Sequence, residues 1–191
     1  WNGMIAPIAG FTVKGNIWYQ GESNVYVGKY YRQTLINLIS SWRNEWNQLD
    51  MPFYFAQLAP YSRDPFPSIR DSQLQVWRKS GLKNVGMVAT ADVGDSIDIH
   101  PRNKKAVGER FARWALAKQY GRDVAYSGPV FKSLSQEGGR LVLEFDYAEG
   151  GLSTSDGEPV KAFEVAGSDK VFRPAVAEIK GGRIEVYSPD V

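Results

Sequence analysis

The sequence lacks cysteine altogether and contains a single histidine, His100, among 191 residues. The absence of cysteine excludes disulfides, thiolate metal sites and a cysteine nucleophile, and leaves the redox compartment undecided. One histidine also excludes metal centres that need several imidazole ligands. Any chemistry that requires an imidazole must therefore use His100.

The sequence also lacks a strong charge imbalance and a long apolar run. Its 23 basic and 21 acidic residues give a formal net charge of +2, and the basic residues are scattered along the chain. A nucleic-acid backbone is bound by clustered positive charge, so we expect no nucleic-acid partner. No segment approaches the roughly 20 apolar residues of a membrane span, and no signal-peptide pattern opens the chain, so we expect no membrane partner.

What the chain does contain is enough apolar residues for a sizeable core. Hydrophobic residues make up 43% and aromatic residues 13% of the sequence, which favours a globular domain, or one domain plus part of another. The residue pattern changes after Gly121. We therefore expect an α/β region over residues 1–121 and a β-rich accessory region over residues 122–191.

The first region alternates between two apolar patterns. Stretches rich in β-branched and aromatic residues, without alternation, predict strands that are covered on both faces. Stretches with apolar residues at helical spacing predict amphipathic helices. The predicted strands span 15–19, 51–59 and 84–90, and the predicted helices span 29–46, 69–80 and 104–120. This order predicts a parallel sheet with helices on its faces.

The second region consists of short apolar runs separated by glycine-rich turns. The pairs 138–139, 156–157 and 181–182 are typical of hairpin turns, which predicts antiparallel strands. The last apolar run, 184–187, ends close to the end of the chain, and we expect it to lack a closing partner. This region is therefore expected to be truncated.

Three polar loops follow the predicted parallel strands, over residues 20–24, 57–63 and 92–100. Loops that leave the carboxyl ends of parallel strands emerge at one edge of a sheet, where ligands bind in such folds. We therefore expect these loops to meet. Their meeting would bring amides and carboxylates beside His100, although a surface or helix-capping histidine is the alternative.

An imidazole beside carboxylates forms half of a Ser-His-acid apparatus, in which the ring removes a proton from a hydroxyl. Ser23 and Ser96 lie in suitable loops, but neither belongs to a Gly-x-Ser-x-Gly elbow. The amides of Gln20 and Asn24 and the backbone N–H of Gly21 are candidate oxyanion donors. The alternative is that these three are ordinary loop and capping residues.

Aromatic residues offer two further candidates. Trp42 and Trp46 lie on the apolar stripe of the first predicted helix and are interpreted as core. The loop over residues 61–66 is expected to be exposed, with sugar binding and plain packing both open.

Two motifs resemble a known family. The segments 18–24 (WYQGESN) and 98–104 (DIHPRNK) are similar to the sialate O-acetylesterase group of the SGNH hydrolase superfamily, which includes related carbohydrate acetylesterases. Residues 2–7 and 157–175 also resemble it. The resemblance implies a flavodoxin-like three-layer α/β domain that hydrolyses O-acetyl esters of sialic acid or another acetylated sugar. It further implies a serine mechanism without metal or cofactor, in a secreted or periplasmic setting.

The resemblance also implies roles for individual residues. His100 corresponds to the general base, and Glu22, in the Gln-Gly-Glu block, either orients the histidine or supports the oxyanion hole. Superfamily members often place the triad acid three residues before the histidine, but Ile97 occupies that position here. The acid therefore remains open among four residues, of which the first two are preferred: Asp98, Glu22, Asp95 and Asp92.

The family's nucleophile lies in an upstream Gly-Gln-Ser-Asn block that these 191 residues do not contain. We therefore expect the first strand and helix of the domain to be missing, as in a fragment, a cleavage product or one of two polypeptides that complete the fold. The rival hypothesis is a carbohydrate-binding or structural fragment without catalysis.

Overall fold

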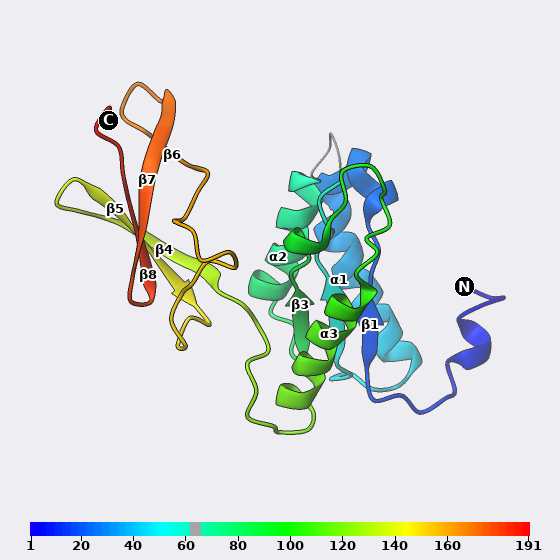
Figure 1. The fold of residues 1–191 in the computed structure, drawn as a ribbon. Helices are drawn as coiled ribbons and strands as arrows, with labels where there is room; N and C mark the ends of the chain where they lie inside the picture. Colours follow the sequence, from blue (N-terminus) through cyan, green and yellow to red (C-terminus); the bar gives the residue numbers. More distant parts are fainter. Residues whose placement is uncertain (62–65) are drawn as a thin grey trace. The chain divides into compact units, whose positions relative to one another are not determined.

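The computed structural model describes residues 1–61 and 66–191 and divides into two compact units, Trp1–Ser127 and Gly128–Val191 (Figure 1). The division lies beyond the expected boundary at Gly121. Tyr126 accounts for part of this difference, because its ring packs 4.7 Å from that of Trp114 in the first unit. Most of the predicted aromatic loop, residues 62–65, lies outside the described residues.

The first unit contains a parallel sheet of three strands in the order β1, β2, β3. The strands are β1 (Asn16–Trp18), β2 (Phe53–Ala56) and β3 (Val85–Val88). Phe53 pairs with Asn16 on one side and with Val85 on the other, so β2 is the central strand. The parallel sheet predicted from the sequence is confirmed.

Three helices connect and follow these strands. They are α1 (Gly28–Glu45), α2 (Pro67–Lys79) and α3 (Lys104–Lys118), and each lies within about two residues of its predicted range. Shorter 3-10 helices are η1 (Ala6–Ile8), η2 (Glu22–Val27) and η3 (Ala91–Val93). None of the helices in residues 1–61 and 66–191 is long and apolar enough to cross a membrane.

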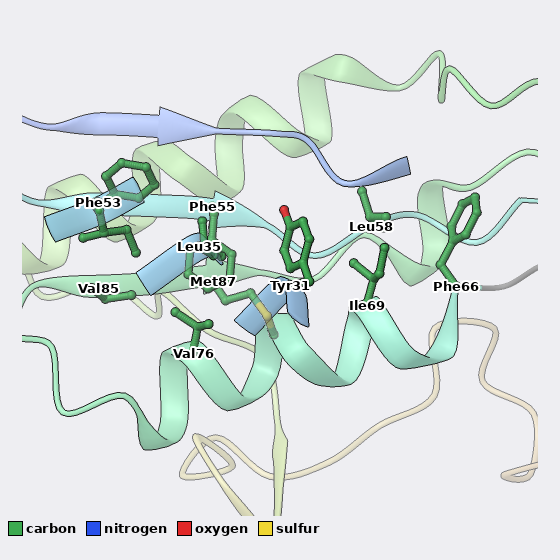
Figure 2. Packing of buried hydrophobic residues seen from close by; sticks show 11 residues of the cluster. Tyr31, Leu35, Phe53, Phe55, Leu58, Phe66, Ile69, Val76, Val85 and Met87 are labelled. Carbon is green, nitrogen blue, oxygen red and sulfur yellow. The ribbon is translucent and has the colours of Figure 1, made fainter. Parts of the chain in front are cut away.

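The central strand shows why its sequence has no polar alternation. Phe53 and Phe55 pack in a cluster with residues of α1 and α2, as Figure 2 shows. Tyr54 and Ala56 point into a second cluster with α3. Because neighbouring strand residues point to opposite faces, helices on both faces require an apolar residue at every position. The central strand is thus packed between two cores, which fixes the position of its carboxyl end, where the second loop begins.

Trp42 of α1 has the core role that was predicted, whereas Trp46, which directly follows α1, is not among the residues packed against the described clusters. Trp42 is half-buried against the first cluster, with ring centroids 5.7 Å from Trp18 and 6.2 Å from Phe53. Trp46 lies next to Trp42, and its indole N–H donates to the carbonyl oxygen of Phe11.

The second unit is a five-stranded antiparallel sheet in the order β4, β5, β8, β7, β6, which confirms the β-rich region. Its strands are β4 (Val130–Glu137), β5 (Arg140–Asp146), β6 (Phe163–Ala166), β7 (Phe172–Lys180) and β8 (Arg183–Tyr187). The predicted hairpin turns at 138–139 and 181–182 are present. Gly138 and Gly139 both have positive φ, which suits glycine.

Two expectations for this unit are wrong. Asp156 and Gly157 do not join paired strands, because β5 pairs with β4 and β8, whereas β6 pairs with β7. They form a turn within the β5–β6 connection, where the Asp156 carboxylate accepts the N–H of Glu158. The last strand does not lack a partner either, because β8 pairs with β5 on one side and β7 on the other.

Candidate active site

A cavity of about 470 Å³ lies in the first unit between the loops that follow β1 and β3. Its wall is formed by Tyr19, Glu22, Ser23, Ile99, His100, Pro101 and Lys104. The structure therefore brings the Glu22–Ser23 turn and His100 together, although they are far apart in sequence. Four other predicted site residues are sequence neighbours of lining residues but do not line the cavity themselves: Gln20, Gly21, Asn24 and Asp98.

The turn after β1 is held by partly buried hydrogen bonds. The carbonyl oxygen of Gln20 accepts the hydroxyl of Tyr31 at 2.7 Å and the amide of Gln73 at 3.4 Å. The side-chain amide of Gln20 donates to Asn24 Oδ1 at 2.6 Å. Both predicted amide donors are therefore fixed in position, and one N–H of Gln20 is already occupied.

Gly21 is required by the shape of this turn. Its φ is +148°, and a Cβ atom here would lie 3.2 Å from both Leu58 Cδ1 and the Tyr31 hydroxyl. Figure 2 shows Tyr31, Leu58 and Ile69 close together in the packed core. A side chain would strain the backbone and crowd these atoms. Gly21 thus lets the chain turn directly into η2, which carries Glu22 and Ser23.

Gln73 of α2 is a supporting residue whose role the sequence did not reveal. Its side chain is fully buried, accepts the N–H of Leu58 at 2.9 Å and donates to the carbonyl of Ala56 at 3.1 Å. Through the bond to Gln20 it also ties the first loop to the second. The sequence did contain one signal, a glutamine on the apolar face of a predicted helix. A buried side-chain amide needs several hydrogen-bond partners, so such a glutamine indicates contacts with neighbouring backbone.

The third loop is shaped by its own acidic residues and by the second loop. One carboxylate oxygen of Asp95 accepts the N–H groups of Ile97 and Asp98, at 2.9 and 3.2 Å. Asp95 also forms a parallel β-bridge with Tyr61, and Gly94 lies so close to Pro60 that a Cβ atom would clash with the backbone carbonyl oxygen of the proline. The second and third loops therefore also meet, as expected from their positions.

Asp98 contacts the histidine directly. Its Oδ1 atom accepts the backbone N–H of His100 at 2.9 Å and lies 3.2 Å from the ring Nδ1. These contacts, with the backbone bond contributing most, lower the pKa of Asp98 below its usual value. The imidazole itself is 83% exposed. The carboxylate thus holds one ring nitrogen, and no hydrogen bond to the other is found within residues 1–61 and 66–191.

The other acidic candidates lie in different surroundings. Asp92 forms a two-pronged ion pair with Arg110, with N···O distances of 2.7 and 2.6 Å, and this contact lowers the pKa of Asp92. Glu22 is half-buried in the cavity wall and forms no ion pair or hydrogen bond within the described residues. Its charge adds to burial, the larger cause, in raising the pKa of Tyr19.

The two candidate serines, Ser23 and Ser96, also lie in different surroundings. Ser23 lines the cavity, whereas Ser96 is exposed and does not line it. The sequence analysis also missed four lining residues, Tyr19, Ile99, Pro101 and Lys104, although all lie in or beside the two motifs. The ammonium of Lys104 lies 5.2 Å from the centre of the Tyr19 ring.

Comparison with known proteins points to one family. A family of carbohydrate esterases, described as sialic acid-specific acetylesterases, matches residues 4–117. The chain is 34% identical over 169 residues to mouse sialate O-acetylesterase and 31% identical over 168 residues to the human protein. These alignments cover 76% and 77% of this chain but 31% and 32% of the relatives. The chain thus spans about a third of the length of the curated relatives it matches.

A solved structure agrees with these relatives. The crystal structure of a carbohydrate acetylesterase from Xanthomonas citri covers the whole chain with a TM-score of 0.89 and 39% sequence identity, and 45% of that protein is matched. The mixed α/β fold is therefore similar to that of a carbohydrate acetylesterase. Because the family match spans more than half of its residues, this chain belongs to the sialic acid-specific acetylesterase family of carbohydrate esterases.

Proposed function

We propose that this chain supplies the general base of a serine esterase that removes O-acetyl groups from sialic acid or another acetylated sugar. The observation that carries this proposal is the contact of His100 Nδ1 with Asp98, beside a cavity that Glu22 and Ser23 also line. A base that is held by a carboxylate at a sheet edge is the arrangement that activates a hydroxyl for acyl transfer.

In this mechanism His100 and Asp98 act as a pair. When Nδ1 carries a proton, it donates to Asp98, and Nε2 is then the acceptor for the proton of an attacking hydroxyl. The lowered pKa of Asp98 keeps its carboxylate ionised, which stabilises the imidazolium as it forms. Glu22 has no contact of this kind within the described residues, so we assign it a role in the cavity wall rather than as the triad acid.

Developing negative charge on the ester oxygen requires donors, and the turn after β1 is the candidate source. The backbone N–H of Gly21 has no acceptor within the described residues, and the amides of Gln20 and Asn24 adjoin it. Donors that are fixed before the reaction stabilise an oxyanion without reorganisation. Tyr31 and Gln73 hold this turn rigid, which supports such a role.

We place the nucleophilic serine in a segment outside these 191 residues, because the sequence has no Gly-Gln-Ser-Asn block. This segment would complete a flavodoxin-like three-layer SGNH domain, with residues 1–121 as its later part and 122–191 as an accessory region. The outer edge of β1 supports this proposal, because no described strand pairs with it and Ile17 is 68% exposed there. The missing strand and helix would come from the same polypeptide or from a second one.

Two further proposals follow from the family. A secreted or periplasmic location suits a protein that acts on acetylated sugars, and the chemistry needs no metal or cofactor. A carbohydrate-binding fragment without catalysis remains the second candidate, since Ser23 is the one aliphatic hydroxyl among the described lining residues and lacks an elbow motif.

The test is hydrolysis of p-nitrophenyl acetate by the chain alone and by the same chain joined to a segment that supplies the serine block. We expect turnover only from the joined protein, and we expect His100→Ala to lower its kcat by roughly 10⁴-fold or more, because the hydroxyl then lacks its base. A circular dichroism spectrum serves as the control for folding.

Two results would contradict the proposal. Turnover by the chain alone that is blocked by a serine-directed phosphonate and lost in Ser23→Ala would identify Ser23 as the nucleophile. Near-normal kcat in the joined His100→Ala protein would show that the histidine is structural. Sugar binding without turnover in the joined protein would favour the carbohydrate-binding candidate.

A further inference from the structure

Lys104 brings an unpaired positive charge to the cavity. It lines the wall beside His100, yet its ammonium forms no ion pair within residues 1–61 and 66–191. Two other cations of α3 do form ion pairs, since Lys105 pairs with Glu109 at 3.8 Å and Arg110 pairs with Asp92. Lys104 is thus the lysine or arginine in the described cavity wall, and no carboxylate of the described residues pairs with it.

The position of Lys104 is not one that folding alone favours. It is the first residue of α3, and the first turn of this helix contains no acidic residue. The amino-terminal end of a helix carries partial positive charge, so a lysine there is unfavourable for the helix itself. The contact with Tyr19 explains how the side chain is held, because the aromatic ring attracts the ammonium and covers one side of it.

We propose that Lys104 binds the carboxylate of an acidic acetylated sugar and thereby selects such substrates over neutral acetylated sugars. This inference rests on the proposed esterase function of the same cavity. A volume of about 470 Å³ is within the usual range for small-molecule sites. Glu22, in the same wall, would repel a carboxylate, so Lys104 is the described lining residue whose charge can offset that repulsion.

The experiment is a binding titration of the 191-residue chain, followed by nuclear magnetic resonance. The probes are an O-acetylated sialic acid and its methyl ester, which keeps the shape but removes the negative charge. We expect the acid to bind more tightly than the methyl ester. Lys104→Met should weaken binding of the acid by about five- to tenfold and leave the methyl ester unchanged, as expected for loss of one partly exposed charge contact.

Lys105→Met is the matched control, because it removes the same charge from the next residue, which does not line the cavity. Lys104→Arg should restore most of the affinity, since it restores the charge. Equal binding of the acid and its methyl ester by the unmodified chain, no binding of either, or unchanged affinity for the acid in Lys104→Met would each overturn the proposal.

This titration involves no turnover, so its failure is distinguishable from failure of the esterase proposal. An inactive joined protein would contradict the catalytic role of His100 without changing the ratio of the two binding constants. Conversely, a ratio of one with an active enzyme would remove only the role of Lys104.

Discussion

At the scale of single residues, the environment separates two carboxylates that the motifs alone do not distinguish. Asp98 contacts the ring of His100, whereas Glu22 lies in the cavity wall without a polar partner in the described residues. The Asp98 contact depends on a turn two residues long, because the same oxygen also accepts the backbone N–H of His100. Orientation of the histidine is thus a local property of the third loop.

This difference predicts unequal effects of two nearly isosteric substitutions in the joined enzyme. Asp98→Asn should lower kcat by up to about 10⁴-fold, because an amide at this position favours the wrong tautomer of His100. Glu22→Gln should lower kcat by about tenfold or less, because no contact with the ring is lost. The measurement is kcat on an acetylated sugar and on p-nitrophenyl acetate.

Asp71→Asn is a suitable control, because Asp71 is an exposed residue of α2 that does not line the cavity. If Glu22→Gln caused the larger loss of kcat, Glu22 would be the orienting acid, and the Asp98 contact would be a feature of the loop alone.

The candidate site was only partly predictable at this scale. The positions of His100 and Glu22 followed from parallel strands, because the ends of such strands share an edge. The supporting role of Gln73 and the lining position of Lys104 depend on how helices pack against loops. Neither property is encoded in local spacing, so single-residue patterns did not reveal them.

At the scale of elements, the loop that carries His100 is fastened to α3. The guanidinium of Arg110 donates to the carbonyl oxygen of Ala89 at 2.6 Å and to both carboxylate oxygens of Asp92. These bonds join the end of β3 to the helix that follows the loop. The start of this loop is therefore fixed by Arg110, and its middle is fixed by the turn at Asp95.

The ion pair predicts a pH-dependent contribution to stability. Because Arg110 lowers the pKa of Asp92 in the folded protein, the contribution is complete above the unfolded pKa and is lost as the pH falls through the lower folded value. Asp92→Asn should therefore reduce the free energy of unfolding by about 0.5–1 kcal/mol at pH 7, a modest value since the aspartate is exposed. The difference should shrink below about pH 4.

Urea unfolding at pH 7, 5 and 3 would measure this effect. Glu109→Gln is the matched control, because it removes a carboxylate from the longer and more exposed pair with Lys105 and should change stability little. An Asp92→Asn difference that stays constant from pH 7 to pH 3 would show that the ion pair does not cause it.

Elements of the first unit were more predictable than the strand pairing of the second. Apolar residues located all three main helices and strands, and both faces of β2 and β3 are buried, whereas Ile17 of β1, predicted to be covered on both faces, is exposed. In the second unit, Asp156 and Gly157 formed a turn as predicted but did not make a hairpin. Local residue preferences determine that the chain turns there, whereas strand pairing depends on distant segments such as β8.

At the scale of the whole molecule, the two units differ in the size of their cores. The first unit contains two clusters, which together bury eighteen hydrophobic residues among those described, as the eleven and seven members show. The cluster of the second unit buries three, Val165, Ala177 and Val186. Because burial of apolar surface is the main stabilising term in folding, we expect the second unit to be much the less stable.

The positions of the tryptophans allow the two units to be observed separately. All six lie in the first unit, at residues 1, 18, 42, 46, 77 and 114, whereas most of the strand content lies in the second unit. In a guanidinium titration, far-ultraviolet circular dichroism should therefore begin to change at a lower denaturant concentration than tryptophan fluorescence. A chain shortened to residues 1–127 should keep the fluorescence transition but lose the early dichroism change. Coincident transitions of the full chain by both probes would contradict this prediction, because they would show that the small core of the second unit unfolds cooperatively with the first.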